Sequence, residues 1–169
     1  LLKDGQAFYL PDFSKDIHHE IELVLQICKN GKNISEKFAA GYYEKIAVGI
    51  DFTARDIQQQ CKEKGLPWEK AKAFDNSAPI GEFISKSEMQ NTGNIDFHLT
   101  INGEVRQNGN SKDMLFSFEK IIAYVSRFIT LKQGDLIYTG TPAGVGAVAI
   151  GDKLEGYIGD KKLLSFEVK

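Results

Sequence analysis

Two glutamates, Glu20 and Glu22, lie two positions apart in the run Ile17-His18-His19-Glu20-Ile21-Glu22-Leu23. The run alternates largely apolar and polar residues, as β-strands do, and alternate side chains of a strand point to the same face. The two carboxylates are therefore expected to be same-face neighbours, roughly 7 Å apart along the strand. Carboxylate oxygens suit Mg²⁺ and Mn²⁺, so the pair is a candidate metal site. An amphipathic strand with its charges in water explains the same pattern.

A third carboxylate, Asp51, ends the apolar run at residues 45–51, which predicts a buried strand. A charge at the edge of a buried strand is costly unless it is paired or metal-bound, and strand ends often carry catalytic groups. A strand-ending acid or a helix cap is the alternative interpretation. The pattern Thr53-Ala54-Arg55-Asp56 next predicts a capping box, and Gly65 suits the end of the helix that the box opens.

Further short elements follow from spacing and turn residues. Asn102-Gly103 between two alternating runs predicts a two-residue hairpin, and apolar residues at helical spacing predict a helix over 117–129 whose buried face includes Phe128 and Ile129. A helix after Ser35 and a strand at 136–139 complete the pattern. Strands and helices do not alternate regularly, so the expected class is α+β.

Composition narrows the possible partners. The 169 residues are 42% hydrophobic and 26% charged, with a net charge of −2, which is typical of one globular domain. Without a basic run, nucleic acid and anionic membranes are not expected partners, and no apolar run is long enough to span a bilayer. The two cysteines, Cys28 and Cys61, have no metal-binding spacing and predict a cytoplasmic location.

Three stretches, in this order, resemble the fumarylacetoacetate hydrolase family. They are HHEIEL at 18–23, VGIDFTARDIQQQCKEKGLPWEKAKAFDNSAPIG at 48–81 and GDLIYTGTPAGVG at 134–146. Within the family, the chain is most similar to the branch of acylpyruvases, oxaloacetate decarboxylases and 2-hydroxyhepta-2,4-diene-1,7-dioate isomerases. The resemblance implies a mixed β-sandwich roll with a few flanking helices, usually as a homodimer. It also implies that Mg²⁺ or Mn²⁺ binds to Glu20, Glu22 and Asp51.

The same resemblance assigns roles to four other side chains. Lys72 matches the family's catalytic lysine, whose ammonium faces the substrate, although a solvated surface lysine is the simpler interpretation from sequence alone. Arg55 and Gln58 lie one turn apart on the predicted helix and match substrate-binding positions, with ordinary surface polarity as the alternative. Thr141 matches a threonine that contacts the substrate carboxylate, with a turn residue before proline as the alternative.

The implied activity is a metal-dependent reaction of a small 2-oxo or 1,3-dicarbonyl acid. Acylpyruvate hydrolysis, oxaloacetate decarboxylation and keto–enol isomerisation, including that of 2-hydroxyhepta-2,4-diene-1,7-dioate, all pass through an enolate that a metal ion stabilises. The sequence does not choose among these reactions. A non-catalytic homologue that binds metal and a dicarboxylate is the main alternative, and an interaction domain with solvated acids is the next.

One family feature is missing from the sequence. The family usually carries a histidine–glutamate pair in an N-terminal stretch of the type G-x-N-Y-x-x-H-x-x-E, and this chain has no such stretch. Since the chain begins Leu1-Leu2-Lys3, we expect residues 1–169 to be a single catalytic domain that lacks its N-terminal lid segment, and the general base is unassigned. His19 is expected to be a satisfied core histidine, and His18 a possible hydrogen-bond partner of a ligand carboxylate.

Overall fold

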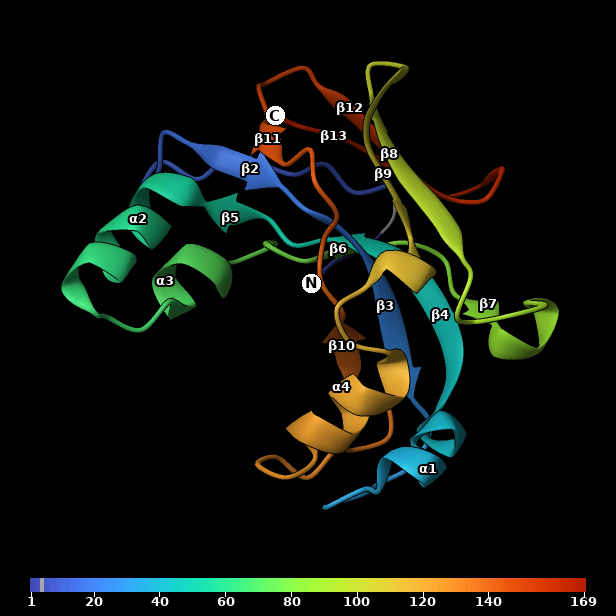
Figure 1. The fold of residues 1–169 in the computed structure, drawn as a ribbon. Coiled ribbons are helices and arrows are strands. Elements are labelled where there is room, and N and C mark those ends of the chain that lie inside the picture. Colours follow the sequence, from blue (N-terminus) through green and yellow to red (C-terminus); the bar gives the residue numbers. More distant parts are fainter. Residues whose placement is uncertain (4) are drawn as a thin grey trace.

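The computed structural model describes residues 1–3 and 5–169 and has an α+β fold of curled, mixed sheets with a few short helices, as predicted (Figure 1). The long strands are β3 (Ile21–Ile27), β4 (Tyr43–Ile50), β8 (Asp96–Ile101), β9 (Glu104–Asn110), β12 (Lys153–Ile158) and β13 (Lys161–Glu167). The short strands are β1 (Leu2–Lys3), β2 (Ile17–His19), β5 (Thr53–Ala54), β6 (Pro79–Ile80), β7 (Ile84–Ser85), β10 (Leu136–Tyr138) and β11 (Gly146–Ala147).

The helices are short. The α-helices are α1 (Glu36–Ala39), α2 (Arg55–Lys64), α3 (Glu69–Lys72) and α4 (Phe118–Val125), and the 3-10 turns are η1 (Ala40–Tyr42), η2 (Lys86–Glu88) and η3 (Ser111–Asp113). Among the described residues, no helix has both the length and the apolar character that crossing a membrane requires.

The antiparallel pair β3–β4 is the centre of the largest sheet, whose order is β1-β6-β4-β3-β10 with β7 also paired to β4. β1 pairs with β6 in parallel, and the other pairs of this sheet are antiparallel. Leu23 and Leu25 of β3 pair with Val48 and Ile46 of β4. This register brings the start of β3 beside the end of β4, so residues next to these two ends are neighbours.

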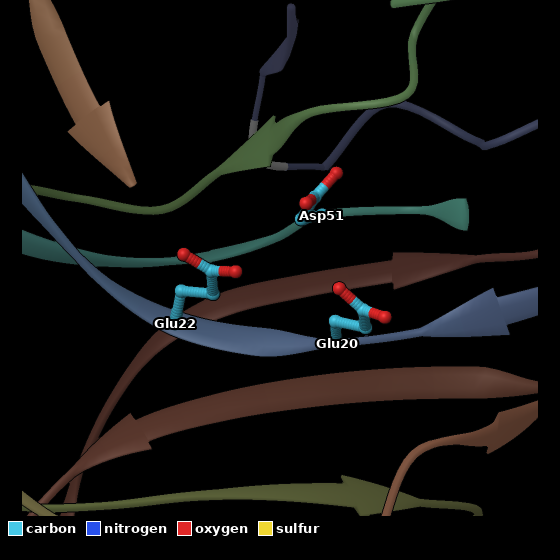
Figure 2. A group of neighbouring side chains, drawn as sticks. All are labelled: Glu20, Glu22 and Asp51. Carbon is cyan, nitrogen blue, oxygen red and sulfur yellow. The ribbon is translucent and has the colours of Figure 1, made fainter. Parts of the chain in front are cut away.

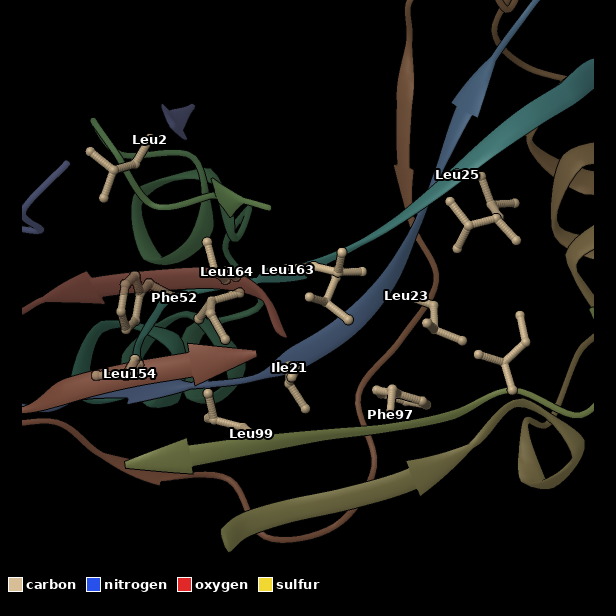
Figure 3. Packing of buried hydrophobic residues seen from close by; sticks show 14 of the residues in the cluster. Leu2, Ile21, Leu23, Leu25, Phe52, Phe97, Leu99, Leu154, Leu163 and Leu164 are labelled. Atoms are coloured by element: carbon tan, nitrogen blue, oxygen red, sulfur yellow. The ribbon is translucent and has the colours of Figure 1, made fainter. Parts of the chain in front are cut away.

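The main core lies between this sheet and the four-stranded sheet β13-β12-β8-β9. Figure 3 shows Ile21 and Leu23 of β3 on the side that faces Leu99 and Phe97 of β8, with Leu154 of β12 in the same core. The odd-numbered apolar side chains of 17–27 are buried in this core, as the alternation predicts. Val24 lies on the opposite face, in a small second cluster with Ala47 and Ile80. Both faces of β3 are therefore covered.

The third sheet has the order β11-β2-β5, and its strand β2 directly precedes β3 in the chain. Helices α2 and α3 lie beside this sheet (Figure 1). Helices α1 and α4 pack against each other at the far end of β3 and β4. The strand-like run that begins at Ile17 is not one continuous strand, because β2 and β3 belong to different sheets and Glu20 lies between them. That change of sheet leaves Glu20 at the junction of two sheets.

The local predictions were mostly confirmed. The hairpin turns at Asn102-Gly103 with φ values of 54° and 82°, as the type I′ turn requires, and Gly65 ends α2 in the left-handed region with φ 62°. β10 matches the predicted strand at 136–139, and α1 begins after Ser35 as predicted, although the Ser35 side chain makes no capping hydrogen bond.

Two predictions were wrong. The helix predicted over 117–129 begins after the Ser117 cap but ends at Val125, and Phe128 and Ile129 are 64% and 60% exposed. The capping box at Thr53 does not form, because Thr53 belongs to β5, where it pairs with His18 of β2. The residue that caps α2 is Ala54, which makes no side-chain cap.

Candidate active site

Three carboxylates meet where β3 begins and β4 ends. Glu20 lies at the junction of β2 and β3, Glu22 is in β3, and Asp51 follows β4 directly. The backbone N–H of Asp51 donates to the carbonyl of Glu20 over 2.8 Å, which fixes the two residues opposite each other. One oxygen from each of the three side chains lies within 4.8 Å of the others (Figure 2). The alternation of the strand thus places both glutamates on the side where Asp51 arrives.

Two cationic side chains contact this triad. Lys72, the last residue of α3, donates from Nζ to Oε2 of Glu20 at 2.8 Å and to Oδ2 of Asp51 at 2.7 Å. Arg55, the first residue of α2, donates from Nη2 to Oε1 of Glu20 at 2.6 Å. Both oxygens of Glu20 are therefore paired with a cation, even though the residue is only 8% exposed.

The carboxylates titrate differently because their partners differ. Burial alone would raise the pKa of Glu20, but the hydrogen bonds from Lys72 and Arg55 outweigh it and hold this pKa below its ordinary value. Burial raises the pKa of Glu22 to about 7, and the nearby Asp51 and Glu20 charges add to the rise. The hydrogen bond from Gly140 and the charge of Lys72 oppose it. Burial also raises the pKa of Asp51, although Lys72 opposes the shift.

Lys72 is a stable ammonium in this arrangement. Burial alone would lower its pKa, but the hydrogen bonds to Asp51 and Glu20 outweigh burial and raise it. Its third contact, at 2.6 Å, is with Oγ1 of Thr53, which in turn donates to the Asp51 carbonyl. Thr53 therefore belongs to the site, although the sequence had predicted that it caps a helix.

The substrate-binding residues predicted from sequence lie on two sides of the triad. Gln58 is buried, and its Oε1 accepts from Nη1 of Arg55 at 2.8 Å, so the shared helix face was correctly inferred. Thr141 is on the loop after β10, where the N–H of Gly140 donates to Oε2 of Glu22 at 2.7 Å. Residues 139–141 of this loop line a cavity of about 430 Å³, and Phe97, Asn108 and Met114 also line it. Gly140 is the link between the cavity and the triad.

The two histidines take different positions. His19 is buried and hydrogen-bonds through Nδ1 to Oε1 of Gln107 at 2.8 Å, so the core interpretation is confirmed. His18 contacts Asp16 through Nε2 at 2.8 Å and not a carboxylate of the triad. The suggested role of His18 beside a ligand is therefore wrong.

Gln107 is the main residue that the sequence interpretation missed. It lies in the predicted hairpin, where the pattern of polar neighbours does not indicate that its side chain is buried. The register of β8 with β9 shifts after Leu99, so that Leu99 pairs with Gln107, Thr100 pairs with Val105, and Arg106 of β9 is the extra residue of the bulge. The shift leaves Val105 exposed and turns Gln107 inward, where it is 1% exposed.

The donor set fits a hard divalent cation. All three candidate ligands are carboxylates, and Mg²⁺ and Mn²⁺ favour such oxygen ligands. Within residues 1–3 and 5–169, the hydrogen bond that the Glu22 carboxylate accepts comes from the Gly140 backbone and not from a cation. A bound cation would offset the cost of burying the Glu22 charge, which is reflected in its raised pKa.

The chain is similar to known proteins over nearly its whole length. Residues 1–169 match the family described as fumarylacetoacetate (FAA) hydrolase C-terminal. The protein of Mus musculus named oxaloacetate tautomerase FAHD1, mitochondrial, is 42% identical over 166 residues, which are 98% of this chain and 75% of that protein.

Two solved structures have the same fold. Fumarylpyruvate hydrolase from Pseudomonas aeruginosa, in complex with Mn²⁺ and pyruvate, superposes with a TM-score of 0.92 at 38% identity, over 99% of this chain and 72% of that one. The 2-hydroxyhepta-2,4-diene-1,7-dioate isomerase from Mycobacterium marinum gives 0.88 at 31% identity, over 98% of this chain and 64% of that one. The chain belongs to the fumarylacetoacetate hydrolase family.

Proposed function

We propose that this chain is a divalent-metal-dependent enzyme that converts small 2-oxo acids through an enolate, with oxaloacetate as the first substrate to test. The observation that carries the proposal is the cluster of Glu20, Glu22 and Asp51, whose oxygens lie within 4.8 Å of one another beside Lys72. A pyruvate and Mn²⁺ complex of a 38% identical hydrolase supports the ligand class, and the 42% identical tautomerase supports the substrate.

Each residue of the proposed site has a defined task. Glu20, Glu22 and Asp51 would hold Mg²⁺ or Mn²⁺, and the bound cation would act as a Lewis acid toward the oxygens of a 2-oxo acid. Lys72 presents an ammonium at the triad, where it can hold the substrate or stabilise developing enolate charge. Arg55 fixes one oxygen of Glu20, and Gln58 holds the guanidinium in place. Arg55, Gln58 and Thr141 would bind the substrate.

The similar proteins indicate a class of substrate, and experiment has to identify the reaction. The similar proteins are named as a tautomerase, a hydrolase and an isomerase, and these reactions share an enolate of a 2-oxo acid. We therefore propose the shared chemistry, with keto–enol tautomerisation of oxaloacetate ahead of acylpyruvate hydrolysis and decarboxylation. The homodimer, the cytoplasmic location and the assignment of residues 1–169 to one catalytic domain stay predictions.

The test is turnover of oxaloacetate, acetylpyruvate and fumarylpyruvate by EDTA-treated protein, before and after addition of Mn²⁺ or Mg²⁺. We expect activity that the metal restores. Glu20→Gln and Asp51→Asn are expected to lower kcat/KM by about a hundredfold or more, because each removes a ligand charge. Glu63→Gln, which changes an exposed carboxylate of α2, is the matched control and is expected to leave turnover unchanged.

Three results would decide against the proposal. Metal binding without turnover of any of the three acids would favour a non-catalytic homologue that binds metal and dicarboxylates. Absence of Mn²⁺ binding by the native chain in calorimetry would reject the metal site itself. Full turnover in EDTA would also reject it, since the proposed chemistry needs the cation.

A further inference from the structure

Gln107 uses both ends of its amide to connect the triad strand with the Thr141 loop. It is 1% exposed on β9. Its Oε1 accepts from the backbone N–H of Ile21 at 3.0 Å and contacts Nδ1 of His19 at 2.8 Å. Its Nε2 donates to Oγ1 of Thr141 at 2.9 Å and to the carbonyl of Pro142 at 3.0 Å. Ile21 lies between Glu20 and Glu22, so one buried side chain touches both halves of the site.

The backbone partners fix which way this amide points. The N–H of Ile21 can only donate and the carbonyl of Pro142 can only accept, so Oε1 must face Ile21 and Nε2 must face Pro142. Both hydrogens of Nε2 are then used, one for Pro142 and one for Thr141. For the same reason the His19 ring must carry its hydrogen on Nδ1, because Oε1 can only accept.

This orientation determines what Thr141 can do. Its Oγ1 accepts from Gln107, so the hydroxyl hydrogen of Thr141 is directed away from Gln107. Thr141 also lines the cavity beside Gly140. A hydroxyl that accepts on its buried side and carries a free hydrogen on its cavity side is a donor suited to an anionic oxygen.

We infer that Gln107 is a positioning residue that fixes the Thr141 hydroxyl as a donor toward the carboxylate of the substrate. The inference rests on the proposed function, since it takes a 2-oxo acid as the ligand. Gln107 itself does not touch the substrate and acts through Thr141. Its Ile21 contact holds the backbone between the two glutamates, so the donor and the triad are aligned by the same amide.

The variant that tests the inference is Gln107→Glu. At pH 8.5 a glutamate keeps an acceptor for Ile21 and His19 but offers no hydrogen to Thr141, so Thr141 would donate to the glutamate and present only lone pairs to the cavity. We expect the dissociation constant of pyruvate, measured by calorimetry on the Mn²⁺-loaded chain, and the KM of oxaloacetate to rise about ten- to a hundredfold. The affinity for Mn²⁺ alone is expected to stay within about threefold of native, because no candidate ligand is changed.

A double-mutant cycle separates this role from a purely structural one. Thr141→Val removes the donor, and we expect Gln107→Glu to weaken pyruvate binding no further in the Thr141→Val background. Additive effects, or an equal loss of Mn²⁺ affinity in Gln107→Glu, would overturn the inference. Gln133→Glu, an exposed glutamine given the same change, is the control and is expected to behave like the native chain.

The inference stays testable if Gln107→Glu does not fold. Thr141→Ser keeps a hydroxyl and Thr141→Val does not, and both leave Gln107 intact. Native-like pyruvate binding by Thr141→Val would therefore overturn the inference. The proposed function fails separately, through the absence of metal-restored turnover of all three acids by the native chain. If the native chain turns over none of these acids but binds pyruvate, the cycle still decides the role of Gln107. If the Mn²⁺-loaded native chain does not bind pyruvate, the inference is rejected, and the turnover assay alone decides the proposed function.

Discussion

Nζ of Lys72 lies 2.7 Å from Oδ2 of Asp51 and 2.8 Å from Oε2 of Glu20, so one ammonium bridges two of the three carboxylates. The lysine comes from the end of α3, and the carboxylates lie just before β3 and just after β4, so two parts of the fold meet at this ion pair. All three side chains are mostly buried. The ammonium thus offsets part of the negative charge that the triad brings out of water.

Replacing Lys72 by methionine removes the positive charge that offsets the carboxylates. Two largely buried carboxylates would each lose a charged partner, and we expect the metal-free chain to lose about 1–3 kcal/mol of unfolding free energy. Saturating Mn²⁺ should stabilise Lys72→Met more than the native chain, because the cation restores the missing positive charge. Urea unfolding in EDTA and in Mn²⁺ measures both effects.

Lys70→Met is the matched control for this prediction, since Lys70 is an exposed lysine of the same helix. It should change neither stability nor its dependence on Mn²⁺. Equal losses for Lys70→Met and Lys72→Met would show that the ion pairs of Lys72 contribute nothing specific.

Glu22 gives the metal-free chain a distinct dependence on pH. Burial raises its pKa from 4.5 to about 7 in the folded state, so between these values the folded chain holds a proton that the unfolded chain has released. This group therefore favours folding below about pH 4.5, and its contribution is lost as pH rises toward 7. The loss is at most about 3 kcal/mol by the conversion of pKa to free energy.

Glu22→Gln should flatten this dependence. Its unfolding free energy in EDTA, relative to the native chain, is expected to increase between pH 5 and pH 7 and to level off above pH 7. Urea titrations at pH 5, 6, 7 and 8 measure the difference, with the exposed Glu44→Gln of β4 as the control. Parallel curves for the native chain and Glu22→Gln across this range would contradict the assignment.

Local rules predict only part of the triad. Alternation along 17–23 places Glu20 and Glu22 on one side. Asp51 was joined to them only through the family resemblance, because the pairing of β3 with β4 that brings it opposite Glu20 is tertiary. The fold class and the hairpin at Asn102-Gly103 follow from equally local signals. What could not be predicted depends on tertiary structure.

Three particular residues show this limit. Gln107 is turned inward by a bulge whose position only the pairing of β8 and β9 reveals. Thr53 does not cap α2 because pairing with β2 holds it in a strand, where its hydroxyl meets Lys72. Helix α4 ends early because Ser126 Oγ donates to the Ala123 carbonyl and accepts from the Ile34 N–H, which anchors the helix end to another segment.

Gly49 is a position where the backbone of the site leaves no room for a side chain. It pairs with Glu22 across β3 and β4. A Cβ at Gly49 would lie 2.7 Å from Cε1 of Tyr138 and 2.9 Å from the Pro79 carbonyl oxygen. The ring of Tyr138 would have to move, and Tyr138 directly precedes the Thr139–Gly140 segment that holds Glu22.

Gly49→Ala is therefore expected to cost about 1–3 kcal/mol of unfolding free energy, as overpacking in a filled interior does. It should also weaken Mn²⁺ binding several-fold, because moving Tyr138 disturbs the Gly140 N–H contact with Glu22. Gly41→Ala is the control, since its Cβ would meet only the flexible Lys29 Nζ at 3.5 Å. Calorimetric titration with Mn²⁺ and urea unfolding measure both effects. A loss of stability with native Mn²⁺ affinity would show that moving Tyr138 does not affect Mn²⁺ binding by the triad.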